Sequence, residues 1–170
     1  MTKKKFLIGA AVVAALGLAS YGYFTRSASV YSERALNAKK DPVLKLTKSQ
    51  RARSCVVLWS INCQACLYSM PHLNILQQHL AMNGGKLILV LAEDHIMLRK
   101  SALAMFLRYN LHNLSTYYDK KNGLQRRYAI KAYPTMLVFN SKGKLVKRVE
   151  GFSPWAQGDK IQEILGLISQ

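Results

Sequence analysis

Two cysteines separated by two residues, Cys63 and Cys66, come directly after a short apolar stretch at residues 55–59. That stretch is rich in β-branched and aromatic residues and predicts a buried strand. Leucines then recur at helical spacing until residues 83–85 (NGG) end the pattern. The pair is therefore expected where a strand turns into a helix. There the helix dipole stabilises a thiolate and should lower the pKa of Cys63, and Cys66 is near enough to form a disulfide with it.

A Cys-x-x-Cys pair can also belong to a zinc site or form an inert structural disulfide. His72 and His79 are candidate zinc ligands, but their spacing from Cys66 matches no zinc pattern, and the chain has no second Cys-x-x-Cys. We therefore favour a redox dithiol and expect neither a metal nor another cofactor. The third cysteine, Cys55, is expected to be a small buried hydrophobic residue.

The N-terminus is typical of a membrane anchor. Lysines at residues 3–5 precede an uncharged apolar run at residues 6–24, which is just long enough to cross a bilayer as a helix. The lysines should stay in the cytoplasm, which would place the rest of the chain in a disulfide-permissive compartment on the other side. We predict an uncleaved anchor over residues 1–28. A cleaved signal peptide with a weak cleavage site at residues 17–19 is the alternative.

The segment that follows is polar and basic. Residues 29–52 predict a linker with one short strand at residues 43–47. The chain has a net charge of +17, of which +9 falls within residues 99–170. No nucleic-acid recognition motif accompanies these charges, so nucleic acid is not an expected partner. Anionic lipid, an acidic partner protein and a merely solvated basic surface all stay open.

Residues 53–170 have room for one domain of ordinary size. Alternating strands and helices followed by a hairpin predict an α/β sandwich whose sheet mixes parallel and antiparallel strands. After the helix that carries the cysteines we expect a strand at 86–92 and then a helix that ends near Asn110, whose buried side is Leu98, Ala102, Phe106 and Tyr109. A strand end at 117–119, a helical turn at 124–128 and a hairpin of strands 135–139 and 144–149 should follow. A last helix should begin at residue 153 and bury Ile161, Ile164, Leu165 and Ile168.

Residues 59–71 (WSINCQACLYSMP) resemble the active-site segment of thioredoxin-fold proteins, and more closely that of the membrane-anchored TlpA/ResA-like thiol–disulfide oxidoreductases of bacteria. Residues 133–135 (YPT) resemble the cis-proline loop of that family, and residues 140–144 resemble its hairpin turn. The resemblance covers residues 53–170. It implies a thioredoxin-like three-layer α/β/α sandwich with a mixed β-sheet, preceded in this chain by an N-terminal transmembrane helix.

The resemblance also implies an enzyme that reduces protein disulfides. Cys63 would be the nucleophile that forms a mixed disulfide with the substrate, and Cys66 would resolve it. Tyr133, a cis Pro134 and Trp59 would form the substrate-binding surface.

The family further implies where such an enzyme works and with which proteins. Its substrates would be apocytochrome c, hence a role in cytochrome c biogenesis, or other secreted proteins. A membrane thiol-reductant donor of the DsbD/CcdA type would recharge it. Its place would be the bacterial inner membrane, as a single-pass protein whose C-terminal domain faces the periplasm or an equivalent extracytoplasmic space.

Three positions depart from the family's pattern. Asn62 stands where relatives usually have a second tryptophan, Ser69 where many have a glutamate, and Val57 where thioredoxin has a buried aspartate. Both acids that could take a proton from the second cysteine are therefore missing. Glu93 and Asp94, at the carboxyl end of the neighbouring strand, are candidate replacements as a proton relay, although capping the next helix is the more ordinary role for acids at this position.

Two other functions stay open at this point. An oxidising role like that of DsbA would use the same cysteines, and the reduction potential would separate it from a reductase. A thioredoxin-fold binding, chaperone or assembly module would not need the cysteines at all.

Overall fold

The computed structural model describes residues 46–93, 96–114 and 116–170. The anchor predicted for residues 1–28 lies outside these ranges, as does most of the linker predicted for residues 29–52. Within the described ranges, no helix is both long enough and apolar enough to cross a membrane.

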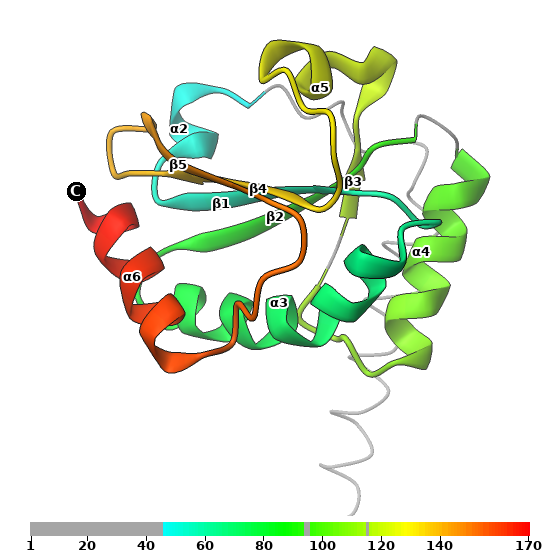
Figure 1. Ribbon diagram of the computed structural model, residues 1–170, viewed down its shortest axis with the longest axis horizontal. Coiled ribbons are helices and arrows are strands. Elements are labelled where there is room, and N and C mark those ends of the chain that lie inside the picture. The colour runs from blue at the N-terminus through cyan, green and yellow to red at the C-terminus, as the bar shows by residue number, and fades with distance from the viewer. Residues whose placement is uncertain (1–45, 94–95, 115) are drawn as a thin grey trace, which may run out of the picture. The chain divides into compact units, whose positions relative to one another are not determined.

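A five-stranded mixed sheet forms the centre of the described domain, in the order β3-β2-β1-β4-β5 (Figure 1). The strands are β1 Ser54–Trp59, β2 Lys86–Leu91, β3 Thr116–Tyr118, β4 Thr135–Phe139 and β5 Leu145–Glu150. β2 pairs in parallel with β1 and β3, whereas β4 pairs antiparallel with β1 and β5. All six residues of β1 are buried, as expected of a central strand covered on both faces.

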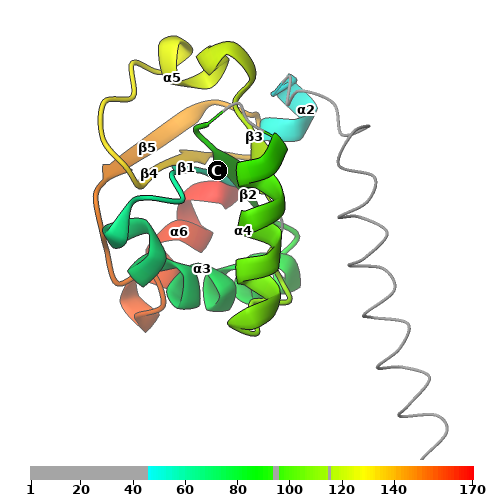
Figure 2. The ribbon, with the colours of Figure 1, turned by 90° about the vertical axis from the view of Figure 1, so that its right-hand side faces the viewer.

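Helices cover both faces of this sheet, as Figure 2 shows for α5 above it and α3 below it. The helices are α2 Lys48–Arg51, α3 Gln64–Met82, α4 Ile96–Arg108, α5 Gly123–Arg127 and α6 Gly158–Ser169. One core joins α3, α4 and α6 to Cys55, Val57 and Trp59 of β1. On the other face, Leu124 of α5 belongs to a core that includes the alternate β1 residues. The predicted α/β sandwich with a mixed sheet is confirmed.

Three local predictions differ from the structure. Tyr109, expected on the buried face of α4, is 65% exposed because the helix has already ended at Arg108 and helical periodicity no longer applies. α6 begins at Gly158 rather than near residue 153, because residues 153–157 form turns closed by backbone hydrogen bonds. The predicted linker ends in the short helix α2, and Leu46, just before α2, is buried in the core beneath α5.

The prediction for Cys55 is confirmed. Its side chain is fully buried in the middle of the sheet, and it forms no disulfide. Burial raises the pKa of the Cys55 thiol to about 12, because a thiolate cannot be solvated there. Cys55 is therefore a packing residue and not a third redox group.

Trp59 closes the core beneath the loop that carries the other cysteines. Its indole N–H donates to Thr116 Oγ1 over 3.0 Å, and its ring stacks on Phe106 with 5.6 Å between centroids. Both Trp59 and Thr116 are buried, so the hydrogen bond has no water to replace it. Trp59 thereby ties the end of β1 to β3 and to α4.

The hydrogen bond between Trp59 and Thr116 leads to a prediction about the stability of the domain. Replacing Thr116 with Val keeps the shape of the side chain but leaves the buried indole N–H without an acceptor, which should cost about 1–3 kcal/mol of unfolding free energy. Thr116→Ser keeps the hydroxyl and should lose less, although it removes a methyl group. Urea denaturation followed by circular dichroism measures both; equal stability of Thr116→Val and the unaltered protein would contradict the assigned bond.

Candidate active site

The two cysteines lie where the chain passes from β1 into α3. Cys63 is the N-cap of α3, and its Sγ accepts a hydrogen bond of 3.1 Å from the backbone N–H of Cys66. The two sulfur atoms form a disulfide, with 5.2 Å between the Cα atoms. The first turn of α3 thus supplies N–H groups and the positive end of its dipole to Cys63, which stabilises negative charge on this sulfur when the disulfide opens.

The two sulfurs differ in their access to solvent. Cys63 is half-buried, whereas Cys66 is fully buried in the core with Ser69 and Met70 of the next turn. A partner can therefore approach Cys63 but not Cys66. This asymmetry is what a nucleophilic first cysteine and a resolving second cysteine need.

The loop before β4 forms the opposite wall of the site. The Tyr133–Pro134 peptide bond is cis, as expected, and the carbonyl oxygen of Tyr133 lies 3.5 Å from Cys63 Sγ. Two hydrogen bonds hold the loop: the Thr135 hydroxyl donates to Ala132 O over 2.7 Å, and Gly151 N donates to Pro134 O over 2.8 Å. A backbone acceptor is therefore fixed beside the reachable sulfur.

Tyr133 also brings its phenol to the site. Burial raises the pKa of Tyr133, and the negative charges of Glu93 and Asp119 raise it further. Asp119 is occupied as an acceptor for the first backbone N–H groups of α5, at 2.8 Å to Leu124 N and 3.0 Å to Gln125 N. The phenol therefore stays protonated and can act as a hydrogen-bond donor.

Glu93 lies at the edge of the sheet that carries the cysteines, just past the end of β2. One carboxylate oxygen accepts a hydrogen bond from the Ser60 hydroxyl, whose oxygen in turn accepts from Asn62 N over 3.3 Å. The other oxygen, Oε2, is buried and has no hydrogen-bond partner. Glu93 is thus linked to the Cys-x-x-Cys loop, whereas Asp94 lies outside the described residues.

Trp59 does not line the substrate surface, contrary to the prediction. Its side chain is completely buried against Phe106 and Thr116, so no protein substrate can touch it. Trp59 supports the site from the core, because its buried contacts hold the end of β1 in place. The sequence resemblance misleads here because a motif shows which residues recur around the cysteines and not which of them reach solvent.

Sequence reasoning missed three residues of the site. Ser60 connects Glu93 to the loop, Gly151 donates to Pro134 O, and Phe152 beside it is 50% exposed. Gly151 has a φ of 79°, a backbone conformation that favours glycine. A glycine placed directly after the last strand was the signal in the sequence that could have marked this third loop.

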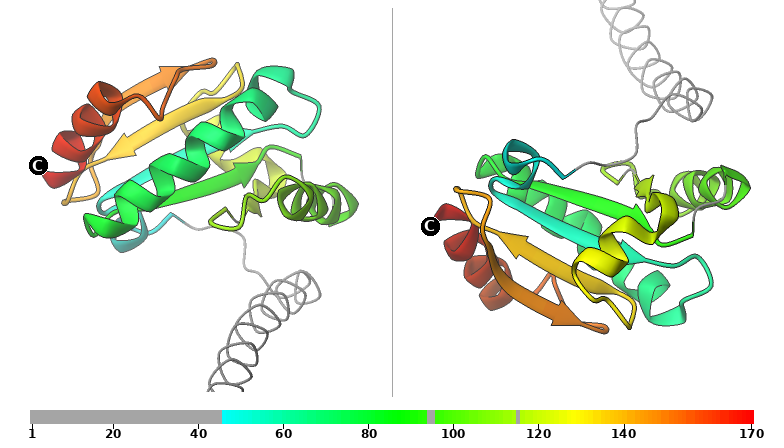
Figure 3. Two further views of the ribbon diagram at one scale, coloured as in Figure 1. Left: turned by 90° about the horizontal axis from the view of Figure 1, so that it is seen from below. Right: turned by 90° about the horizontal axis from the view of Figure 1, so that it is seen from above.

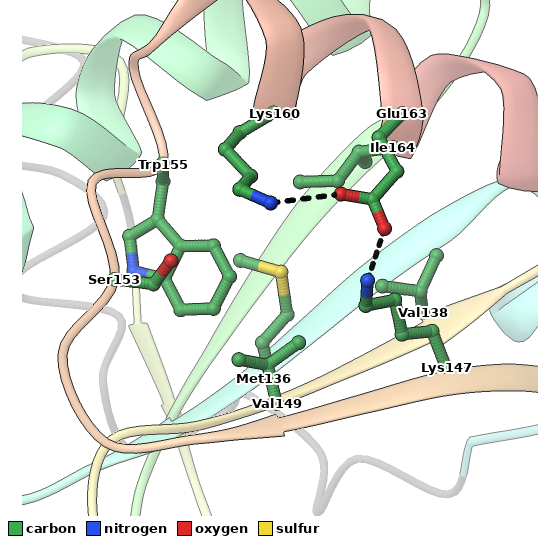
Figure 4. Close-up of a pocket in the computed structure, with 9 residues that line it drawn as sticks. All are labelled: Met136, Val138, Lys147, Val149, Ser153, Trp155, Lys160, Glu163 and Ile164. Atoms are coloured by element: carbon green, nitrogen blue, oxygen red, sulfur yellow. Dashed lines mark hydrogen bonds and ion pairs between the residues drawn. The ribbon is translucent and has the colours of Figure 1, made fainter.

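No group of three or more histidine, cysteine, aspartate or glutamate side chains that could hold a metal ion gathers within the described ranges. A small cavity of about 80 Å³ lies between β4, β5 and α6 (Figure 4). Lys147 and Lys160 both pair with Glu163 at this cavity, and the hydrogen bond from Lys147 holds the pKa of Glu163 below its usual range. No cysteine lines this cavity, so the thiol chemistry lies elsewhere.

The accessible position of Cys63 predicts an order of reactivity. After reduction, limiting iodoacetamide at neutral pH should modify Cys63 first, Cys66 much more slowly, and Cys55 only after unfolding, because burial keeps the Cys55 thiol protonated. Peptide mapping by mass spectrometry gives the order. Early labelling of Cys66 or Cys55 would contradict the assignment.

No family model matches the chain, and no curated protein matches it significantly. Solved structures do. A Chlorobium tepidum protein assigned as the thiol:disulfide interchange protein DsbE is 22% identical, with 71% of this chain and 84% of that chain covered and a TM-score of 0.59.

Two further solved structures are similar. The exposed lipoprotein thioredoxin Etrx1 of Streptococcus pneumoniae is 23% identical over 66% of this chain and 82% of its own, with a TM-score of 0.55. A secreted Mycobacterium tuberculosis disulfide oxidoreductase, homologous to DsbE of E. coli, is 17% identical, with 69% of this chain and 83% of that chain covered and a TM-score of 0.52. At these identities the likeness shows the fold: the described domain has the thioredoxin-like fold of thiol:disulfide interchange proteins.

Proposed function

We propose that the chain is a thiol–disulfide oxidoreductase that reduces protein disulfides. The observation that carries this function is the Cys63–Cys66 disulfide at the start of α3, with Cys63 alone reaching the surface. The wall opposite, formed by Tyr133 and Pro134, offers a fixed carbonyl 3.5 Å from the reachable sulfur. The solved structures of similar fold, named as thiol:disulfide interchange proteins, support the same activity.

The reaction starts from the reduced dithiol. The Cys63 thiolate attacks one sulfur of the substrate disulfide, forms a mixed disulfide and releases the other substrate sulfur as a thiolate. The Cys66 thiolate then attacks Cys63 Sγ, which restores the Cys63–Cys66 disulfide and releases the second substrate thiolate. Two electrons pass from the dithiol to the substrate, whose two thiolates take up protons. A dithiol donor must return the electrons before the next cycle.

The substrate chain lies across Cys63 and the Tyr133–Pro134 loop, which contact each other. Tyr133 O faces the sulfur, so a substrate segment that reaches Cys63 also reaches this acceptor with a backbone N–H, in the manner of an added strand. Pro134 O is already taken by Gly151 N, and this bond keeps the wall in place while the substrate binds.

Glu93 is the group that we assign to proton transfer during the second step. Cys66 is fully buried and its thiol needs a base before it can attack. Glu93 is joined to the Cys-x-x-Cys loop through Ser60, and its free oxygen Oε2 is available for a proton. Asp94 next to it is the alternative relay residue.

The domain would work outside the cytoplasm, held at the bacterial inner membrane by the apolar segment at residues 6–24. A membrane thiol reductant of the DsbD/CcdA type would supply its electrons, and secreted proteins, among them apocytochrome c in cytochrome c biogenesis, would be its substrates. The three lysines before that segment and the disulfide in the domain support this placement.

The proposed activity predicts that both cysteines are needed for turnover. With dithiothreitol as reductant, the unaltered protein should reduce the disulfides of insulin, whereas Cys63→Ser should lose the activity completely because no nucleophile remains. Cys66→Ser, reduced and then freed of dithiothreitol before insulin is added, should instead accumulate a mixed disulfide with insulin, visible on a non-reducing gel. Cys55→Ser is the matched control and should stay active. A chaperone or assembly module would behave alike with or without Cys63, and equal insulin reduction by Cys63→Ser would contradict the proposal.

A second prediction concerns Glu93. Glu93→Gln keeps an acceptor for the Ser60 hydroxyl but cannot take a proton, so the resolving step should slow by about 10²-fold at neutral pH. The rate should recover as the pH rises, because hydroxide then takes the proton that Glu93 no longer accepts. Single-turnover kinetics at a series of pH values measure this. Ser60→Ala, which removes the hydrogen bond but leaves the carboxylate, is the control. An unchanged pH profile in Glu93→Gln would show that the residue is structural.

A further inference from the structure

The helix that carries the cysteines has an unusual composition. α3 is the longest described helix, at 19 residues, and it contains no Asp, Glu, Lys or Arg. The chain as a whole has a net charge of +17, and every other described helix has at least one lysine or arginine. Charged residues normally cover the solvent side of a surface helix. Their absence from α3 therefore sets this helix apart from the rest of the domain.

The solvent side of α3 is also apolar. Tyr68 is 65% exposed, Ile75 42% and Met82 72%, and Pro71 is exposed as well. With the two polar but uncharged glutamines on the same line, these positions follow each other at intervals of three and four residues and so share one side of the helix. We call this line the α3 stripe: Gln64, Tyr68, Pro71, Ile75, Gln78 and Met82.

Within the described part of the chain, no helix or strand lies over the α3 stripe. Figure 3, seen from below, shows α3 in front of the sheet with its outer side open and with α6 and α4 on either side. The buried leucines of α3, Leu73, Leu76 and Leu80, face the opposite way into the core. The helix thus has a second, outward apolar side that the domain itself does not cover.

The stripe is continuous with the redox site. Gln64 is the residue directly after Cys63, so the stripe begins at the reactive sulfur and extends about 27 Å along the helix. At its side, the exposed Phe152 packs against His72 of α3, with 5.7 Å between ring centroids. The loop of Phe152 is held to the cis-proline wall by the Gly151 N to Pro134 O bond. One uncharged surface therefore reaches from the disulfide along α3.

We propose that the α3 stripe and Phe152 dock an uncharged, apolar face of the protein that exchanges its disulfide with Cys63. This inference rests on the proposed oxidoreductase function. A protein whose cysteine reaches Cys63 must lie over the start of α3, and the surface that continues from there offers apolar contacts and no charge to pair with. The recognised partner is therefore one whose cysteine pair adjoins an apolar, uncharged surface.

Two other occupants fit the same surface less well. Helices that lie on lipid carry lysine or arginine beside their apolar side, and α3 has neither. A second copy packed through the whole stripe about a twofold axis would lay its own α3 over Cys63 and close the sulfur to substrates. An apolar redox partner is the occupant that keeps the dithiol in use.

Two synthetic peptides with the same Cys-x-x-Cys disulfide test this proposal. In one peptide a helix with a leucine and alanine face follows the cysteines; in the other, glutamate replaces the leucines. The reduced protein should reduce the apolar peptide about tenfold faster, and Ile75→Lys or Tyr68→Lys should remove most of that advantage. The rate with the small uncharged disulfide of hydroxyethyl disulfide, which touches only the sulfur, should stay the same in all variants.

Leu107→Lys on α4 is the matched control, because Leu107 is 43% exposed and Ile75 is 42% exposed. It should change none of these rates, and circular dichroism verifies that each variant is folded. A protein that fails to reduce hydroxyethyl disulfide would overturn the oxidoreductase function itself. If the protein reduces hydroxyethyl disulfide but reduces the two peptides at the same rate, only the docking proposal is overturned.

The other occupants give distinct results that would also overturn the proposal. Flotation with phosphatidylcholine and phosphatidylglycerol vesicles that Ile75→Lys abolishes would assign the stripe to lipid. Sedimentation as a dimer that the same substitution splits into monomers would assign it to a second copy.

Discussion

The site depends on the register in which β1 pairs with both of its neighbours. Leu58 is opposite Val90 of β2 on one side and Thr135 of β4 on the other. The ends of β1 and β2 and the start of β4 therefore meet at one edge of the sheet. Ser60, Glu93 and Tyr133 follow or precede these strands by one or two residues, so the pairing alone brings them to the cysteines. A shift of one residue would turn every β1 side chain to the wrong face.

Around the sulfur atoms the protein supplies dipoles and hydrogen-bond acceptors, and the first turn of α3 contains no charged residue. Helix N–H groups stabilise Cys63, while Tyr133 O and the Ser60–Glu93 pair line the same edge. Thiolate stabilisation therefore comes from the helix start.

The fold and the dithiol were predictable from sequence because they rest on local patterns: an apolar run, helical leucine spacing, and a hairpin with a glycine turn. Pro134 was predictable as cis from the resemblance of its loop. Exposure was not predictable, since Trp59 and Tyr133 look alike as aromatic residues and only the packing of β3 and α4 buries the first. The bond from Ser60 to Glu93 also escaped prediction, because it joins residues 33 apart in sequence. The start of α6 was misplaced because a serine and a proline initiate turns as readily as helices.

The two outer strands of the sheet, β3 and β5, affect whether the domain aggregates with other chains. An unpaired strand edge is a template on which a strand of another chain can pair. β3, at one edge, has only three residues. β5, at the other, carries Lys147 and Arg148 in its middle, and its pairing with β4 is interrupted by an irregularity between Val138 and Phe139. Short length, positive charge and broken regularity each discourage edge-to-edge aggregation of the domain.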